Sequence, residues 1–429
     1  MLFVARSLWT LVALVAWVAP GVCLATPSSF SEFAIYGEQS VDIDRHEVFG
    51  GPIGSAGNVV VNSSEISGVY SGGNVLVNGV SNDINGDIVA MGTVYVTPNH
   101  DIYGSVHSSA PAGTLVGAEV VGPQSSSITG DVIANGDVDL ENVTTLGGSV
   151  YSNGDLDAAL NGTIGQDARA NGSVIIGANA AVAGDLVYGT TLTLDPGASV
   201  AGSTSQGATV VSPTTFTGIS LPTPAIFSGG SGVVDEAGTS LADPLAPGTY
   251  GTLEAEDIFL TGGTYVFSAI DIAKNADLYL DLSGDPIEIF VEGDVLFDGP
   301  TKTLEVLISE DGIDTDDMED ATIALASKLW LETHGTFRAN RLSEWFGAVY
   351  APYEGIDAPE LSGVGALYAG GHVDGDVSAP GMKLTLGSGS QTHIFVAPDY
   401  VPVPEPTTAL LLALGLAGLG TRSRRRVNH

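Results

Sequence analysis

The feature that most constrains the fold is a gapless 18-residue repeat in the first half of the chain. Four consecutive stretches, beginning at Gly130, Gly148, Gln166 and Gly184, align without insertions. Apolar residues recur in fixed columns, which are Val132–Val150–Ala168–Leu186, Val138–Leu156–Val174–Leu192 and Leu140–Ala158–Ile176–Leu194. A fixed period is typical of stacked architectures, in which each repeat buries its apolar face against the next.

One further column extends this repeat upstream. It reads Ile66, Ile84, Ile102, Ile128, Leu146, Ile164, Val182 and Val200. Successive members lie one repeat apart, except that the interval from Ile102 to Ile128 is longer. We therefore predict an insertion of eight residues, within the loop "SSAPAGTLVGAEVVG".

The pattern inside each repeat predicts short strands separated by corners. Apolar residues alternate with polar ones, as in Val138 and Leu140, which indicates strands with one buried face. Asn-Gly pairs at 135–136, 153–154 and 171–172 mark corners, where we expect positive φ angles. The sequence predicts an all-β parallel β-solenoid with 18-residue coils. The alternative, a β-sandwich, would require the four gapless repeats to be coincidental.

The phrasing of these repeats, as in "GDVIANGDVDL" from Gly130, resembles the bactofilin-like, polymer-forming solenoids of bacteria over residues 50–205. The resemblance implies self-association end to end through the terminal coils, because solenoid ends are unpaired strand edges. Here the chain continues well beyond the last coil, so one end could be covered.

The second half is predicted to be a further β-rich domain. Residues 212–232, "SPTTFTGISLPTPAIFSGGSG", are typical of a linker. The later phrases "PGTY", "GGTYVF", "IFVEGDV" and "GAVYAP" resemble a domain common in bacterial surface proteins. The predicted domains are a signal peptide (1–25), the β-solenoid (26–210), a linker or irregular connection (211–247), a second β-rich domain (248–400) and a sorting signal (401–429).

The segment 1–25 is typical of a secretory signal peptide. Arg6 precedes the apolar run "LWTLVALVAWVA", and Ala25 supplies a small residue for cleavage. The alternative is an uncleaved anchor helix. Cleavage after Ala25 would remove Cys23, the single cysteine of the chain. The mature protein would then lack disulfides and thiolate nucleophiles.

The charge of the chain limits its partners. The formal net charge is −37, and only eight of the 13 Lys and Arg lie between the two terminal segments. Binding of nucleic acid requires clustered basic residues, so we exclude it. A body this acidic could attract cations such as Ca²⁺ or serve solubility outside the cell.

The C-terminal segment combines a short motif, an apolar run and a basic cluster. Val403, Pro404, Glu405 and Pro406 precede the apolar run 409–420. The basic residues that follow are Arg422, Arg424, Arg425 and Arg426. An unaided membrane helix needs about 20 apolar residues, but flanking threonines and snorkelling arginines extend this run. The arginines would then stay cytoplasmic as a membrane stop.

This three-part order closely resembles the PEP-CTERM sorting signal of Gram-negative bacteria. The resemblance implies that a membrane exosortase recognises the Pro-Glu-Pro motif and removes the tail. The protein would then pass from the inner membrane to the cell surface or extracellular matrix, touching membrane only through its two terminal segments. The alternative is a plain C-terminal membrane anchor.

Sites for chemistry are sparse in the sequence. No Ser-His-Asp, His-Glu-x-x-His, phosphate-loop or Cys/His metal pattern occurs, and no cofactor is predicted. The acidic run 309–320 offers candidate Ca²⁺ ligands, namely Asp311, Asp314, Asp316 and Asp317, or is simply a solvated loop. Asp87, Asp131 and Asp185 share a column with Ser105 and Ser149. We expect them to cap turns rather than form a cation ladder.

These observations favour a non-enzymatic extracellular structural protein, deployed in a surface layer or exopolysaccharide matrix. Its expected partners are the exosortase, matrix components such as exopolysaccharide, and further copies of itself. One alternative is a β-helix polysaccharide lyase or hydrolase, with an acidic pair as acid and base. Another is an adhesive or ice-binding face, for which the sequence offers only Thr191-Leu192-Thr193.

Overall fold

The computed structural model describes residues 26–386 of the chain, apart from several internal segments. The segments left out are 45–46, 49–50, 80, 98, 111–114, 118–125, 141–142, 159–160, 208–211, 235–242, 255–256, 273–276, 298–324, 340–344, 359–362 and 371–382. The predicted helical signal peptide, the C-terminal hydrophobic helix and the candidate Ca²⁺ ligands from Asp311 to Asp317 lie outside the described residues.

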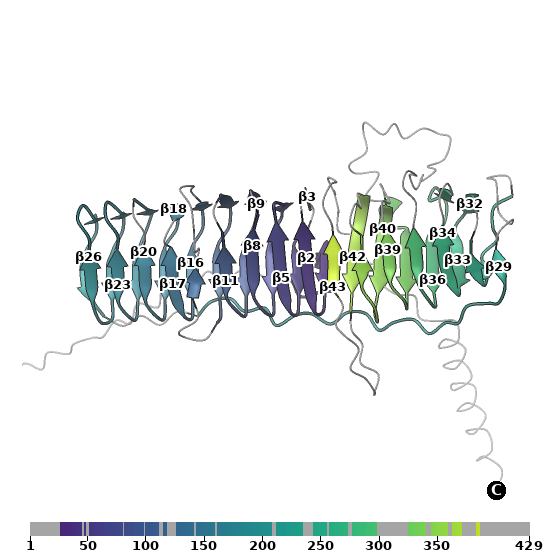
Figure 1. The fold of residues 1–429 in the computed structure, drawn as a ribbon, viewed down its shortest axis with the longest axis horizontal. Coiled ribbons are helices and arrows are strands. Elements are labelled where there is room, and N and C mark those ends of the chain that lie inside the picture. The colour runs from purple at the N-terminus through teal and green to yellow at the C-terminus, as the bar shows by residue number, and fades with distance from the viewer. Residues whose placement is uncertain are drawn as a thin grey trace, which may run out of the picture.

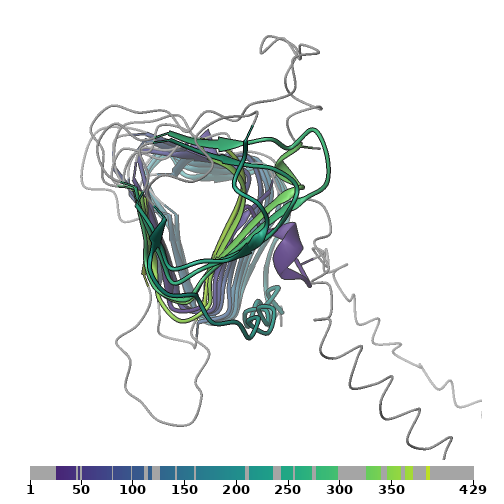
Figure 2. The ribbon, with the colours of Figure 1, turned by 90° about the vertical axis from the view of Figure 1, so that its right-hand side faces the viewer.

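The protein is an all-β parallel β-solenoid with a three-sided cross-section, which confirms the predicted fold class (Figures 1 and 2). Two sheets of 16 strands, here sheets A and B, run the whole length of the rod. A third sheet of nine strands, sheet C, closes one half, and the pair β32 (Asp257–Leu260) and β35 (Asp277–Leu280) lies in the other half. A single 3₁₀ turn, η1 (Phe30–Glu32), precedes the first strand.

The spatial order of the strands in each sheet differs from their order along the chain. Sheet A is β28 (Thr204–Gln206), β25 (Leu186–Tyr188), β22 (Ala168–Ala170), β19 (Val150–Ser152), β16 (Val132–Ala134), β13 (Val106–Ser108), β10 (Ile88–Ala90), β7 (Val69–Ser71), β4 (Ile53–Ser55), β1 (Ile35–Gly37), β42 (Gly363–Ala369), β40 (Trp345–Ala351), β38 (Leu329–Thr333), β36 (Ile287–Val291), β33 (Gly263–Phe267) and β30 (Gly248–Thr249). Sheet B is β26 (Leu192–Leu194), β23 (Val174–Ile176), β20 (Leu156–Ala158), β17 (Asp137–Leu140), β14 (Leu115–Gly117), β11 (Val94–Val96), β8 (Val75–Asn78), β5 (Asn58–Asn62), β2 (Ser40–Asp44), β43 (Lys383–Leu386), β41 (Ile356–Asp357), β39 (Phe337–Ala339), β37 (Val295–Phe297), β34 (Ala269–Ile272), β31 (Thr252–Leu253) and β29 (Val233–Val234). Sheet C is β27 (Ser199–Val200), β24 (Ala181–Val182), β21 (Thr163–Ile164), β18 (Val143–Leu146), β15 (Ser126–Ile128), β12 (His100–Ile102), β9 (Asn82–Ile84), β6 (Glu65–Ile66) and β3 (Glu47–Val48).

The register between coils follows the columns of the sequence repeat. Val132 pairs with Val150, and that column continues through the next two coils to Leu186. In sheet B the column from Val138 runs in the same way, and in sheet C the isoleucine column pairs from Ile66 onward. The inward residues of these columns are buried and form one continuous apolar core, because parallel strands stacked in register superimpose identical positions.

The eight-residue insertion is divided around one strand. Tyr95 pairs with Gly117, and Gly117 pairs with Asp139, so each of these two spacings exceeds the repeat length by four residues. In sheet A the whole insertion falls between two neighbouring strands, β13 and β16, so Val106 pairs with Val132. The extra residues therefore lie on both sides of β14, and most fall outside the described residues.

The Asn-Gly corners lie between strands, as expected, but the predicted positive φ angles are wrong. None of the three pairs is among the described residues with positive φ. The glycine is needed because the coils approach closely: a Cβ at Gly172 would lie 2.0 Å from Asp155 Oδ1. The asparagines form a ladder, in which Asn171 Nδ2 donates to Asn153 Oδ1 and Asn153 Nδ2 donates to Asn135 Oδ1, each at 3.1 Å.

The chain builds the rod from its middle outward. It begins with η1 and β1 near the centre of sheet A and winds coil by coil to β28 at one end. Residues 212–229, here called the strap, then run back along the outside of the rod past the first coil (Figure 1). Winding restarts at the opposite end with β29 and β30 and returns to the middle at β42 and β43. Strands of residues 248–386 thus share sheets A and B with strands of residues 35–206.

Candidate functional site

The strap is held against the outer face of sheet A by side chains that satisfy its backbone. At one end His107 Nδ1 accepts a hydrogen bond from the Thr214 amide at 3.0 Å. Further along, the Tyr36 hydroxyl accepts from the Ile219 amide at 3.0 Å and lies 3.2 Å from the Ile219 carbonyl oxygen. An extended segment has no internal hydrogen bonds, so these contacts fix its path.

The second half of the strap is held by acidic residues and a tyrosine. Glu332 Oε1 accepts from the Ala225 amide at 2.7 Å, and Glu292 Oε2 accepts from the Gly229 amide at 2.8 Å. The Tyr350 hydroxyl donates to the Pro222 carbonyl. Glu332 is 4% exposed, so its hydrogen bond to the strap offsets the cost of burying a carboxylate.

Aromatic side chains fill the space between the strap and sheet A. Phe216 of the strap is buried, with ring centroids 5.7 Å from both Phe33 and Tyr70. Phe227 packs its ring 4.3 Å from the imidazole of His334. Phe216, Phe33 and Tyr70 belong to a second apolar cluster outside the solenoid core.

Burial shifts the pKa values of three tyrosines on this face. Burial raises the pKa of Tyr36 above its ordinary value, and it does the same for the pKa of Tyr70. The pKa of Tyr350 is raised far more, by burial first and then by the charge of Glu332. The protonated hydroxyls of Tyr36 and Tyr350 hydrogen-bond to the strap backbone, so the face is suited to holding a backbone segment.

A ladder of aspartates and serines caps one row of corners, which confirms the predicted capping role. Asp131 Oδ1 accepts from the Ser149 amide of the next coil at 2.7 Å, and Asp185 Oδ1 accepts from the Ser203 amide at 2.7 Å. The whole ladder is Asp87, Ser105, Asp131, Ser149, Asp167, Asp185 and Ser203. The hydrogen bonds from Ser203 lower the pKa of Asp185. Within the described residues, no group of three or more His, Cys, Asp or Glu is arranged to hold a metal ion.

His100 is a buried polar residue inside the corner between sheets B and C. Its side chain is 1% exposed, and Nδ1 accepts from the Asn82 amide at 2.9 Å. Nε2 lies 2.9 Å from Thr97 Oγ1. Burial lowers the pKa of His100 to about 4, because desolvation disfavours the charged imidazolium. The imidazole is therefore neutral at pH 7 and serves the fold.

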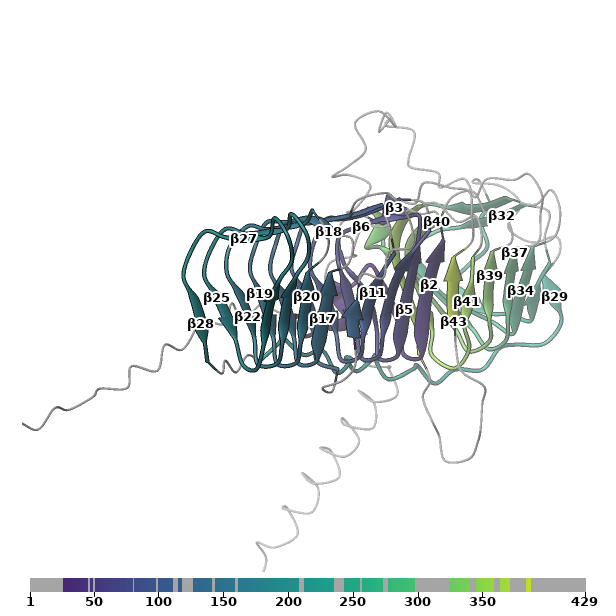
Figure 3. The same ribbon diagram turned by 60° about the vertical axis from the view of Figure 1, so that its left-hand side comes forward.

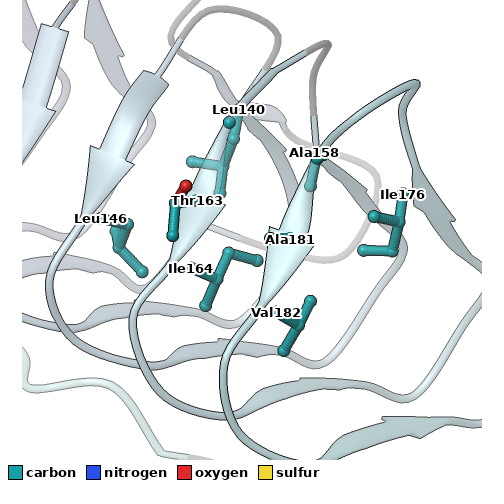
Figure 4. Close-up of a pocket in the computed structure, with 10 residues that line it drawn as sticks. Leu140, Leu146, Ala158, Thr163, Ile164, Ile176, Ala181 and Val182 are labelled. Atoms are coloured by element: carbon teal, nitrogen blue, oxygen red, sulfur yellow. The ribbon is translucent and has the colours of Figure 1, made fainter. Parts of the chain in front are cut away.

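An apolar cavity lies inside the core of the first half (Figure 4). Its volume is about 10 Å³, close to the lower limit for one water molecule. The lining includes Leu140, Leu146, Ala158, Ile164, Ile176 and Val182. The small side chain of Ala158, in a column that otherwise carries Leu140 and Ile176, leaves this space. It is a packing defect and is too small for a ligand.

The rod ends at β26, β27 and β28 (Figure 3), and apolar side chains are partly uncovered there. Leu194 is 46% exposed, whereas Ile176, one coil inward in the same column, is fully buried. Leu192 and Val200 of the same coil are also only partly buried. The described rest of the chain does not cover this terminal coil. The other end of the first half is covered, because β42 and β43 pair with β1 and β2.

The sorting signal is recognised independently of the structure. A model of the PEP-CTERM protein-sorting motif matches residues 402–426, which include the predicted Val403–Pro406 motif and all four arginines. Such a motif implies processing by an exosortase and export to the cell surface or extracellular space. The matched residues lie outside the described part of the chain. In that described part, no helix is long and apolar enough to cross a membrane.

Comparison with known proteins adds little beyond this motif. No curated protein sequence matches the chain. The crystal structure of the C-terminal domain of a tapirin from Caldicellulosiruptor kristjanssonii is similar over 90% of this chain and 98% of that chain, at 11% identity. The TM-score of 0.30 is too low to support an argument. The bactofilin-like resemblance is not confirmed by these comparisons.

Sequence reasoning missed the strap and the residues that hold it. His107, Tyr350 and Glu332 belong to no repeated motif, and the composition of the strap predicted only a linker. The available signal was in that same composition: prolines at 213, 222 and 224 favour an extended backbone, and Phe216 and Phe227 are too apolar for a free linker.

Proposed function

We propose that this protein is a non-enzymatic structural component of the bacterial cell surface or extracellular matrix. The observation that carries the proposal is the combination of one continuous solenoid rod with a PEP-CTERM motif at residues 402–426. The parallel strands pair along the whole rod, and the capping ladders satisfy its corners. A rigid body of this kind suits a spacer or scaffold outside the cell.

The proposed route begins at a cleaved signal peptide and passes through the inner membrane of a Gram-negative cell. The apolar run 409–420 lodges in the membrane, and the arginines from 422 to 426 keep its end in the cytoplasm. An exosortase then recognises Pro404, Glu405 and Pro406, and the rod enters the surface layer or the exopolysaccharide matrix.

The route can be tested by intact mass of the protein from its native host, fractionated into membrane, surface and medium. We expect a species lacking both the segment 1–25 and the tail beyond about Pro406, in the surface or medium fraction. A species that retains the arginine tail and stays in the membrane would refute sorting and establish a permanent anchor.

The non-enzymatic assignment has its own test. The purified body, without its terminal segments, is incubated with a panel of acidic and neutral polysaccharides. We expect no new reducing ends and no unsaturated products. Cleavage of any glycan would overturn the assignment and favour a β-helix lyase or hydrolase.

A second copy of the chain is the partner that the exposed end favours. The edges of β26, β27 and β28 face away from the rod, and Leu194 is half-exposed beside them. Sheets A and B run to both ends with all strands parallel, so one rod can add to another by simple translation. Sedimentation of the wild-type body against Leu194→Lys tests this: the wild type should form larger, concentration-dependent species. Equal, monomeric behaviour of both would refute it.

A further inference from the structure

The first and last coils of the chain meet in the middle of the rod. β1 pairs with β42, so that Ile35 lies beside Leu367, and β2 pairs with β43, so that Val41 lies beside Leu384. The Leu367 amide donates to the Ala34 carbonyl at 3.0 Å. In sheet B, β43 has nine strands on one side and six on the other. The chain therefore leaves the described structure from the flank of the rod, far from both ends.

This junction, here called the seam, is held closed by contacts outside the solenoid core. The Tyr368 hydroxyl donates to the Phe33 carbonyl at 3.3 Å, and the Tyr368 ring meets Phe30 edge-on at 5.2 Å. The strap crosses the seam, because it is bound by Tyr36 of the first coil on one side and by Tyr350 of β40 on the other. β43 is consequently fixed at the centre of a rigid body.

The last described strand, β43, lies far from both ends of the rod. Strands about 4.8 Å apart place β26 about 43 Å from β43, and β29 about 29 Å from it. Fifteen residues separate Leu386 from the matched motif at residue 402. A tail lodged in a membrane is therefore joined to the rod at its flank and not at either end.

The side of the rod from which the chain leaves is also defined. β43 runs parallel to β2, and β2 ends at the edge where the chain turns from sheet B into sheet C. In the three-sided cross-section this edge lies opposite sheet A (Figure 2). The strap-covered face is thus the one farthest from the point of attachment.

We propose that the sorting tail holds this rod by its middle, so that both solenoid ends remain free while the protein is attached. The proposal rests on the proposed function in one respect, the lodging of the tail in a membrane. It adds the geometry of attachment. A rod held at its flank can bind one partner at each end, whereas a rod held at its tip has only one free end for a partner.

Electron microscopy of the chain from residue 26 to residue 429 in lipid nanodiscs tests the proposal. A Ser205→Cys variant, biotinylated and bound by streptavidin, marks the β28 end, where Ser205 is exposed. We expect the disc on the side of the rod, about 40 Å from the marker and about 30 Å from the other end. A Val233→Cys marker, at the 53% exposed Val233, should appear on the opposite side of the disc.

The matched control is the same chain ended at residue 401, which should show rods without discs. A disc at either tip of the rod would overturn the midpoint attachment and leave the sorting proposal intact. Rods without discs even when the tail is present would overturn the attachment together with the membrane step of the proposed route. Sorting itself is judged separately, by the fractionated masses.

Discussion

Replacing Phe216 by alanine should release the strap from sheet A without disturbing the solenoid. Phe216 is 3% exposed, and its ring centroid lies 5.7 Å from those of Phe33 and Tyr70. Truncating a buried phenylalanine costs about 3–5 kcal/mol in a closed core. Water can enter a surface site and relieve part of that cost, so we expect about 2–4 kcal/mol. The loss should fall on strap opening, since the strap is not part of the coils.

Hydrogen exchange of the strap amides measures this opening directly. The Thr214 and Ile219 amides are bound by His107 and Tyr36, so they exchange only when the strap lifts. A loss of about 2–4 kcal/mol corresponds to exchange about 30- to 1,000-fold faster. The control is Ile226→Ala on the same strap, because Ile226 is 86% exposed and should change exchange little. Equal exchange in the wild type and Phe216→Ala, or equal acceleration by both variants, would refute the reasoning.

Three other predictions concern the coils. Burial lowers the pKa of His100 from 6.5 to about 4, so the unfolded chain binds the proton first as pH falls. The free energy of unfolding should therefore drop by about 3 kcal/mol between pH 6.5 and 4. Denaturant unfolding of His100→Asn across this range should lack that drop. Gly172→Ala should cost about 1–3 kcal/mol, because its Cβ would displace Asp155 Oδ1, which accepts a hydrogen bond from the Ser173 amide at 2.6 Å. Gly284→Ala, with nothing within 4 Å of the added Cβ, should be near neutral in the same assay. Ala158→Val should raise the unfolding free energy by about 0.5–1 kcal/mol by filling the core cavity, and a loss would show that the site is already full.

The coil structure could be predicted from the sequence because a solenoid repeats one environment. In a parallel stack each inward position meets the same position of the next coil, so Val132, Val150 and Ala168 carry the same constraint. That constraint is visible as a column without any structure. The corner conformation was not visible in this way, since Asn-Gly fits both a positive φ and a close stacking contact.

The path of the chain between the two halves could not be predicted. The pairing of β1 with β42 joins residues more than 300 positions apart. It occurs once, so no periodic pattern in the sequence predicts it. The strap contacts are also unique and long-range. His107 and Thr214 are joined by a single hydrogen bond that no sequence repeat predicts. Unique long-range contacts leave no local pattern in one sequence.

The candidate sites divide in the same way. The sorting motif is a linear sequence that another protein recognises. Its residues from Val403 to Arg426 can therefore be identified from the sequence alone, and they match a known motif. The strap-holding face depends on the fold, because Glu332 and Tyr350 come together only through sheet A. The candidate Ca²⁺ loop from Asp311 to Asp317 stays a prediction.

The measurement that most directly tests the arrangement of the rod is the distance between spin labels at Ser205 and Val233 in the mature protein. The two residues are close in sequence, yet the strand order puts them at opposite ends of 16-stranded sheets. With strands about 4.8 Å apart, electron–electron double resonance should give about 70 Å. A distance below about 40 Å would mean that the second half does not begin at the far end of the rod, and it would contradict the fold described above.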